Sequence, residues 1–156
     1  MDNKNLPMRI GVGIILLNKK NQVFVGKRKD NPGDKWQMPQ GGVDQGEDFI
    51  SAMKRELIEE TSIKSIKILK EIEKMYQYEL PENLVGIIWK GKYRGQKQKW
   101  FITRFLGEEN EINLKTKHPE FINWKWVEPQ KLPEIIVHFK KELYLNLLKE
   151  INLIID

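Results

Sequence analysis

The sequence of 156 residues contains no cysteine. Disulfides, thiol nucleophiles, iron–sulfur clusters and cysteine-ligated zinc sites are therefore excluded together. Long apolar runs are also missing, because the longest, Ile14–Leu17, is far shorter than the roughly 20 residues of a membrane-spanning helix. The polar segment Met1–Pro7 lacks the apolar core of a signal peptide. We therefore expect a cytoplasmic protein with no membrane partner; the sequence gives no indication of a protein partner.

Histidine and arginine are scarce. Neither His118 nor His138 has a serine-nucleophile motif or a zinc-type partner nearby, so we expect both to be structural or surface residues. The arginines among the 27 basic residues are Arg9, Arg28, Arg55, Arg94 and Arg104. A planar guanidinium binds phosphate and carboxylate with two donors and stacks on bases, which an ammonium cannot do. Each arginine is therefore a candidate site residue.

The remaining composition is that of a globular protein with a basic surface. Hydrophobic residues make up 40% and charged residues 31% of the chain, and the formal net charge is +5. This length and composition predict a single domain over residues 1–156. The positive charge favours an anionic, phosphate-rich ligand.

The apolar pattern in the first half predicts a β-hairpin and a helix. A strand at Val12–Leu17 and a second strand at Gln22–Arg28 flank a polar turn, and a loop follows at Asp30–Lys35. Trp36–Gly42 is predicted to be a short extended piece. A helix should then run from Glu47 or Asp48 to Thr61, with a buried stripe that consists of Ile50, Met53 and Leu57.

The second half predicts more strands and a terminal helix. Alternating residues indicate strands at Ser65–Tyr78, Gln98–Phe105 and Phe121–Val127, and a short helix is expected at Pro129–Ile136. The terminal helix His138–Ile155 should bury Phe139, Leu143, Leu147, Ile151 and Ile154 or Ile155. This order of elements predicts an α+β sandwich with helices on both faces of a mixed sheet.

Three carboxylates share one face of the first predicted helix. Glu56, Glu59 and Glu60 stand at i, i+3 and i+4 and fall within an arc of about 100°. Arg55 lies beside Glu59, but one guanidinium cannot neutralise three carboxylates, whereas a hard divalent cation with oxygen ligands can. We therefore predict Mg²⁺ as the cofactor, with Mn²⁺ as a substitute. On helix spacing alone, the alternative is a solvated glutamate-rich face.

The surrounding segment resembles a known signature. Gly41-(x5)-Glu47-(x7)-Arg55-Glu56-Leu57-x-Glu59-Glu60-x-Ser62-Ile63 is similar to the Nudix box of the Nudix hydrolase superfamily. Ser62 departs from it, because the family has glycine there. This position follows the helix C-terminus, where the left-handed conformation costs a residue other than glycine roughly 1–2 kcal/mol.

The resemblance implies an α/β/α sandwich with a loop-helix-loop metal site that hydrolyses a nucleoside diphosphate linked to another group. By this resemblance the metal ligands are Glu56, Glu59 and Glu60 together with the Gly41 carbonyl, and water attacks phosphorus. Glu47 is expected to orient Arg55, which in turn holds the glutamates. Glu56 is the first choice for the general base, with Glu120 or Glu59 as the alternatives.

The flanking motifs resemble one branch of the superfamily. Trp36–Gly42, Gly95–Phe101, and Pro119-Glu120-Phe121 followed by Trp124 and Trp126 are similar to bacterial RNA 5′-pyrophosphohydrolases and to asymmetrical dinucleoside polyphosphate hydrolases. This match makes Glu120 a fourth catalytic and metal-binding carboxylate. The substrate-binding residues that we predict are Arg9, Arg28, Gln40, Tyr78, Gln96, Lys97, Lys99, Val137, Phe139 and Lys140.

Two groups among these residues have further support from the sequence. Gln96, Lys97 and Lys99 lie in the segment Trp89–Trp100, where basic and aromatic residues alternate as expected for phosphate contacts and base stacking. A lysine-rich strand edge that prevents aggregation is the alternative. Arg28 and Phe139 could hold the 5′-terminal base between them, although Phe139 could equally belong to the core.

The sequence leaves four candidate functions. The leading one is Mg²⁺-dependent removal of pyrophosphate from the 5′ end of triphosphorylated RNA. Cleavage of diadenosine polyphosphates with release of ATP needs the same groups. A catalytically inactive Nudix domain that senses nucleotides or RNA is disfavoured by the intact carboxylates, and removal of damaged free nucleotides is disfavoured by the flanking motifs.

Overall fold

The structure, a computed structural model, describes residues 5–30 and 33–155. Residues 1–4 of the polar start and residues 31–32 of the predicted loop Asp30–Lys35 lie outside this range. The described strands form one mixed sheet in the order β4-β6-β1-β2-β7, with β3 paired to β1 and β5 paired to β6. The strands are β1 Met8–Leu17, β2 Val23–Arg28, β3 Gln40–Gly42, β4 Ile66–Glu71, β5 Tyr76–Glu79, β6 Gly95–Phe105 and β7 Phe121–Val127.

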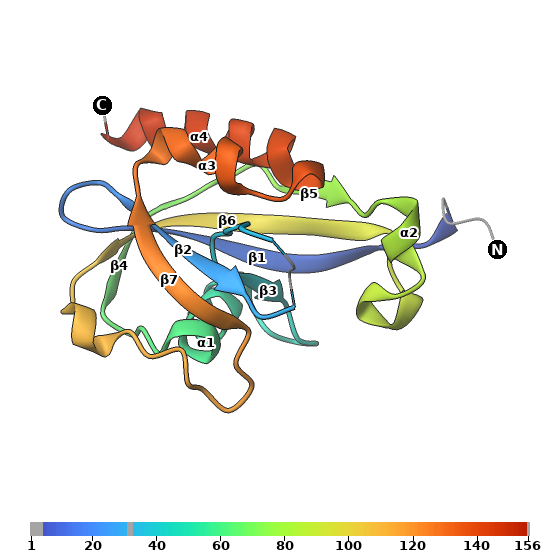
Figure 1. The fold of residues 1–156 in the computed structure, drawn as a ribbon, viewed down its shortest axis with the longest axis horizontal. Coiled ribbons are helices and arrows are strands. Elements are labelled where there is room, and N and C mark those ends of the chain that lie inside the picture. Colours follow the sequence, from blue (N-terminus) through green and yellow to red (C-terminus); the bar gives the residue numbers. More distant parts are fainter. Residues whose placement is uncertain (1–4, 31–32, 156) are drawn as a thin grey trace.

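Helices cover both faces of this sheet. In Figure 1, α1 (Phe49–Thr61) lies below the sheet, while α3 (Leu132–Ile135) and α4 (Lys141–Ile155) lie above it. The short helix α2 (Glu82–Val85) follows β5 at one end of the molecule. The 3₁₀ turns are η2 Ile88–Gly91, η3 Glu109–Glu111, η4 Pro129–Lys131 and η5 His138–Lys140. The predicted α+β sandwich is therefore confirmed. No described helix has the length and apolar character needed to cross a membrane.

Two apolar clusters lie in the core, one between the sheet and α4 and the other between the sheet and α1. Trp100 of β6 packs edge-on against Tyr144 of α4, and neither ring is exposed. On the opposite face, Phe101 belongs to the cluster that contains Met53 and Leu57 of α1. Burying a side chain of this size contributes about 1.5–3 kcal/mol to the free energy of unfolding. The two clusters hold α1 and α4 against opposite sides of the same strands.

Strands β1 and β2 diverge toward one end of the sheet. Their pairing is confined to Leu17 and Val23, whereas β3 pairs with β1 at Gly11–Gly13. Beyond the divergence, β2 pairs with β7 and also contacts Gln37 through the bridge at Gly26. The segment 37–42 therefore fills the space between the diverging strands, because it bonds to β1 on one side and to Gly26 of β2 on the other.

Helix α1 ends at Thr61 as predicted and begins at Phe49, just after the predicted start at Glu47 or Asp48, but its buried face differs. Asp48 caps the N-terminus by accepting a hydrogen bond from the Ser51 N–H (2.7 Å). The prediction that Ile50 is buried is wrong, because its side chain is 42% exposed. In the first turn Phe49, and not Ile50, packs against the cluster that contains Met53 and Leu57, so the buried face of α1 is rotated away from Ile50. Met53 and Leu57 are buried as predicted.

Some strands in the second half differ from their predicted bounds, because β6 pairs with two separate strands. The prediction of one strand at Ser65–Tyr78 is wrong, because the segment forms β4 and most of β5, which pair with successive parts of β6. β6 begins at Gly95 instead of Gln98. β7 has the predicted bounds. The terminal helix starts at Lys141, after a 3₁₀ turn that contains Phe139. Of the predicted stripe, Leu143, Leu147 and Ile151 are buried, while Phe139, Ile154 and Ile155 are half-buried.

Ser62 compensates in part for the missing glycine. It adopts the left-handed conformation (φ 68°), and its N–H donates to the Ile58 carbonyl (2.8 Å). Its hydroxyl donates to the Asn113 carbonyl (2.8 Å), and the Asn113 N–H donates to the Thr61 carbonyl (2.9 Å). The hydroxyl therefore ties the end of α1 to the segment before β7.

We expect Ser62→Ala to lower the free energy of unfolding by about 1 kcal/mol, because the strain stays and the hydroxyl bond is lost. Ser62→Gly should be close to neutral, since it removes about 1–2 kcal/mol of strain together with that bond. Urea unfolding of both variants measures the difference. A glycine variant more stable than the wild type by the whole strain energy would show that the hydroxyl bond contributes nothing.

Candidate active site

Three of the predicted carboxylates lie at different depths on α1. Glu60 is only 3% exposed, the Glu56 side chain is 14% exposed, and the Glu59 side chain is 57% exposed. Glu56 lies directly against β3, because a Cβ atom at Gly41 would overlap its carboxyl carbon. Glycine at position 41 is therefore required for the Glu56 carboxylate to approach the β3 backbone.

Arg55 joins the loop before α1 to two of these carboxylates. Its guanidinium donates two hydrogen bonds to Glu47 (2.8 and 2.9 Å) and one to the Gly42 carbonyl (2.8 Å). It also donates to Glu56 (2.9 Å) and Glu59 (3.2 Å). The bonds from Arg55 lower the pKa of Glu47 to about 2, so Glu47 is ionised at neutral pH. The predicted contact between Glu47 and Arg55 is thus present.

The buried part of the cluster is short of positive charge. Burial raises the pKa of Glu60 well above its usual range, and repulsion from Glu56 and Glu120 adds to this effect. Burial also raises the pKa of Glu56, although Arg55 opposes the shift. One oxygen of Glu60, Oε2, is buried without a hydrogen-bond partner among the described residues. A cation bound here would reduce the repulsion between the carboxylates and would give the unpartnered Glu60 oxygen a ligand.

These donors suit a hard divalent cation by their chemistry. Glu56, Glu60 and Glu120 interact electrostatically, all their donors are oxygens, and the Gly41 backbone lies beside Glu56. Within residues 5–30 and 33–155, however, no three acidic, histidine or cysteine side chains are arranged to hold one ion. Arg55 holds Glu56 and Glu59 in this arrangement.

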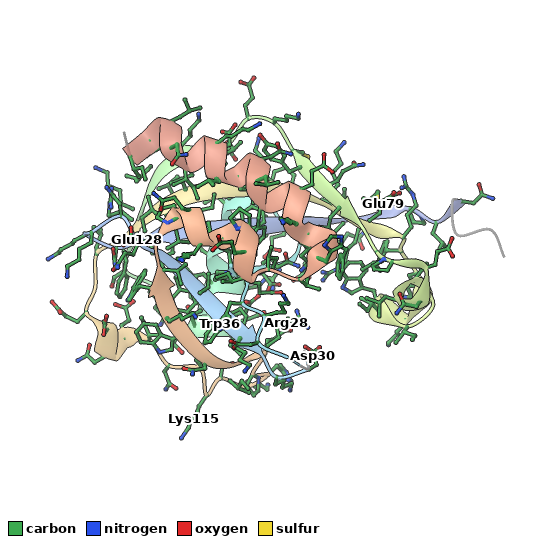
Figure 2. The ribbon with its side chains drawn as sticks, turned by 45° about the horizontal axis from the view of Figure 1, so that its top comes forward. Arg28, Asp30, Trp36, Glu79, Lys115 and Glu128 are labelled. Atoms are coloured by element: carbon green, nitrogen blue, oxygen red, sulfur yellow. The ribbon has the colours of Figure 1, made fainter. Side chains whose placement is uncertain are left out.

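Arg28 lies at the end of β2, opposite α1. It donates two hydrogen bonds to Asp30 (2.8 and 2.9 Å), and its Nη1 lies 3.6 Å from the Glu120 carboxylate. Figure 2 shows Arg28 and Asp30 beside each other at this end of the strand. The Lys29 N–H donates to the Glu120 carbonyl (3.0 Å), which fixes the loop before β7 against β2. Glu120 reaches the acidic cluster through this contact.

One cavity of about 630 Å³ joins the acidic cluster to a group of aromatic residues. The predicted site residues that line it are Arg9, Arg28, Gln40, Gly41, Glu56, Tyr78, Glu120, Val137, Phe139 and Lys140. Arg28 and Phe139, the proposed pair around the 5′-terminal base, therefore face the same space. Most of the predicted substrate-binding set is brought together here.

An aromatic and cationic group forms one part of the cavity wall. The rings of Tyr78 and Phe139 are 5.9 Å apart, and Nζ of Lys140 lies 4.8 Å from the Tyr78 ring. Burial and repulsion from Arg28 lower the pKa of Lys140 to about 7. The Gln37 side chain is the hydrogen-bond partner of Lys140 (3.5 Å). An anionic ligand at this point would restore the lysine charge.

Buried glutamines support the cavity from behind. Gln40 donates to the Tyr78 hydroxyl (3.1 Å), which donates to Gln96 (3.0 Å). Gln98 bonds to both Gln40 (3.1 Å) and Gln96 (3.0 Å). Gln96 is fully buried and does not line the cavity, so it can act on a ligand through Gln40, Tyr78 and the Gly41 carbonyl, to which it donates (3.4 Å).

Lys97 and Lys99 are not brought to the cavity. They alternate along β6 with Gln96 and Gln98 and therefore point to the other face of the sheet. Lys97 is exposed, while Lys99 donates to the Glu73 carbonyl (2.9 Å). Lys97 and Lys99 therefore do not line this cavity, and their expected contact with substrate phosphates stays a prediction.

The sequence pattern did not identify every residue of the cavity. Asp30 and Gln37 were not predicted, although each is close in sequence to a predicted residue. Trp89 was part of the basic aromatic segment but was not named as a site residue. His118 and His138 are both exposed, in agreement with their expected surface position.

Comparisons with known proteins agree with this geometry. The NUDIX domain family matches residues 7–147. The chain is 58% identical to the RNA pyrophosphohydrolase of Pelagibacter ubique over 99% of both chains. It is 45% identical to the RNA pyrophosphohydrolase of Sphingopyxis alaskensis over 96% of both.

Solved structures share the fold at low identity. The E. coli dihydroneopterin triphosphate pyrophosphohydrolase has a TM-score of 0.71 at 18% identity, covering 92% of this chain and 99% of that one. A C. elegans Ap4A hydrolase has a TM-score of 0.63 at 19% identity, covering 91% and 98%. The box Gly41–Ile63, the arrangement of its carboxylates and these matches lead to one conclusion: the chain belongs to the Nudix family.

Proposed function

We propose that this Nudix hydrolase removes pyrophosphate from the 5′ end of triphosphorylated RNA. Its class, a hydrolase acting on pyrophosphate bonds, follows from the family and from the relatives of matching length. The observation that supports the RNA substrate most directly is that Glu56 and Glu120 line the same cavity as the neighbouring rings of Tyr78 and Phe139. Such a cavity fits a substrate that combines a polyphosphate with a base.

Mg²⁺, or Mn²⁺ in its place, is the proposed cofactor. Glu56, Glu59, Glu60, Glu120 and the Gly41 carbonyl would hold it. When bound, it supplies charge neutralisation at the phosphate oxygens and a lower pKa for the attacking water. The buried, unpartnered oxygen of Glu60 supports this assignment.

The chain's own residues orient the reaction. Glu56 is our first choice to take the proton from the water that attacks phosphorus, because Arg55 holds its carboxylate in a fixed position beside β3. Glu120 and Glu59 are the alternatives. Arg55 is a positioning residue, because it fixes Glu56 and Glu59 and is itself fixed by Glu47.

Substrate contacts are assigned to the cavity lining. Arg9 and Arg28 supply charge to phosphates near the acidic cluster, while Tyr78, Val137, Phe139 and Lys140 form a site for a base. Gln40 and Gln96 keep the Tyr78 hydroxyl in place. Lys97 and Lys99 are not assigned to the 5′ end, because they lie on the other face of β6.

Product identification tests the proposal against the alternatives. With Mg²⁺ we expect pyrophosphate release from 5′-triphosphorylated RNA, and a higher kcat/KM for this RNA than for diadenosine tetraphosphate. Chelation of the metal should stop turnover. ATP release from diadenosine tetraphosphate as the faster reaction would make the dinucleotide the main substrate. Tight RNA binding with no product from either compound would indicate a sensor.

A further inference from the structure

Arg9 and Trp89 form a second aromatic and cationic pair in the same cavity. The guanidinium carbon of Arg9 lies 5.2 Å from the centroid of the Trp89 ring, and both residues line the cavity. The Arg9 guanidinium also packs against β3, because a Cβ atom at Gly42 would overlap it. Arg9 therefore extends from the Trp89 ring to the strand whose Gly41 contacts Glu56.

The backbone of this segment is unusual. Trp89 (φ 53°, ψ 36°) and Lys90 (φ 57°, ψ 27°) are consecutive left-handed residues, a conformation that residues other than glycine rarely adopt. The Trp89 ring also packs edge-on against Tyr93 at 6.0 Å. Strained conformations of this kind are retained where the surrounding structure holds a side chain in a required place. Here the strained turn holds the indole at the cavity wall.

The surroundings of Trp89 suit a nucleobase next to a phosphate. The ring is half-exposed, and Leu84, Ile87 and Ile88 line the cavity near it. Ile87 is 72% exposed, so this wall has apolar surface available. Among the described residues, no carboxylate oxygen lies within 4 Å of the Arg9 guanidinium. Its charge is therefore available for an anion, and its plane for stacking.

We propose that Trp89 is a stacking platform for a second nucleobase of the substrate, and that Arg9 holds the phosphate that lies between this base and the acidic cluster. The inference rests on the proposed function. It adds a specificity residue, because one base stacks near Tyr78 and Phe139 and another on Trp89. A substrate with two bases then binds better than one with a single base.

A cycle of protein and substrate changes tests the platform. We compare the wild type with Trp89→Ala on a 5′-triphosphorylated dinucleotide and on two analogues, each of which lacks one of the two bases. With the intact dinucleotide, Trp89→Ala should lower kcat/KM about tenfold, chiefly through KM. With one of the two abasic analogues, this loss should disappear. Equal losses on all three substrates, or no loss, would overturn the proposal.

Two further variants separate stacking from folding. Trp89→Phe keeps an aromatic face and should restore most of the lost kcat/KM. Lys90→Ala is the matched control, because Lys90 shares the left-handed turn but is exposed and does not line the cavity. It should leave kcat/KM unchanged. A loss in Lys90→Ala equal to that in Trp89→Ala would assign the effect to the turn and not to the ring.

The platform and the proposed function can fail separately. If the wild type releases no pyrophosphate from triphosphorylated RNA, the proposed function fails, and the same cycle is run with diadenosine tetraphosphate and its analogue lacking one adenine. A readout without turnover is the fluorescence of 2-aminopurine placed at either position of the triphosphorylated dinucleotide. Trp89 should quench the probe at one position, and Trp89→Ala should remove that quenching. No difference at either position would contradict the platform.

Discussion

Glu60→Gln is expected to lower kcat at least about a hundredfold while it raises the melting temperature of the metal-free protein. The substitution keeps the shape of the side chain but removes its charge from the proposed metal site. Glu60 is buried, one of its oxygens has no hydrogen-bond partner in the described part of the chain, and Glu56 and Glu120 repel it. The Glu60 charge that the reaction needs is therefore expected to destabilise the fold when no cation is present.

The gain in stability should depend on pH. The pKa of Glu60 in the folded chain is raised above its unfolded value, so the metal-free wild type is stabilised at low pH and loses this contribution as pH rises through the folded pKa. Glutamine does not titrate. The difference in melting temperature between Glu60→Gln and the wild type should therefore be large at high pH and shrink as pH falls.

Turnover and thermal unfolding, each measured with and without Mg²⁺, check this prediction. Glu142→Gln is the matched control, because Glu142 is exposed on α4 and does not line the cavity. It should change neither quantity. If Glu60→Gln keeps more than about a tenth of the wild-type kcat, Glu60 is not a ligand that the reaction requires.

Gly41→Ala should also lower kcat, by about tenfold or more, because small displacements of catalytic groups are costly. The added methyl group would overlap the Glu56 carboxyl group and must push it away from β3. Arg55 holds the same carboxylate, so the displacement should also disturb the Arg55 contacts. Steady-state kinetics and unfolding of the variant are the measurements.

Gly86→Ala provides the control for this change. Gly86 has an ordinary backbone conformation (φ −81°), and a Cβ atom there would meet nothing within 4 Å. This variant should retain wild-type activity and stability. Full activity in Gly41→Ala would show that the position of the Glu56 carboxylate against β3 is not needed for turnover.

The carboxylate cluster could be predicted because its geometry is local. Glu56, Glu59 and Glu60 share one face of a helix through their spacing alone, and Arg55 stands one residue before Glu56 and four before Glu59. The depth of each side chain could not be predicted in this way. Glu60 is buried and Glu59 exposed because of how α1 packs on the sheet, and Ile50 is exposed for the same reason.

The local sequence pattern could not predict contacts between segments that are far apart in the chain. Glu120 and the group at Val137–Lys140 were predicted only through the resemblance, because the pairing of β2 with β7 and the position of η5 bring them to the cavity. The basic aromatic pattern also does not show which face of a strand each residue occupies, so it could not place Lys97 and Lys99 on the face of β6 away from the cavity. Trp89 depends on a left-handed turn that its residue type does not favour.

The parallel pairing of β1 with β6 has a consequence for biosynthesis. Met8 pairs with Gly95 and Leu17 with Arg104, so β1 leaves the ribosome long before its partner strand is made. At translation rates of about 5–20 residues per second this interval is on the order of 10 s. During it the apolar strand has no complete sheet to join, and pairing across so long a loop is slow. Nascent chains that stall before Gly95 should therefore be the species that bind chaperones or aggregate.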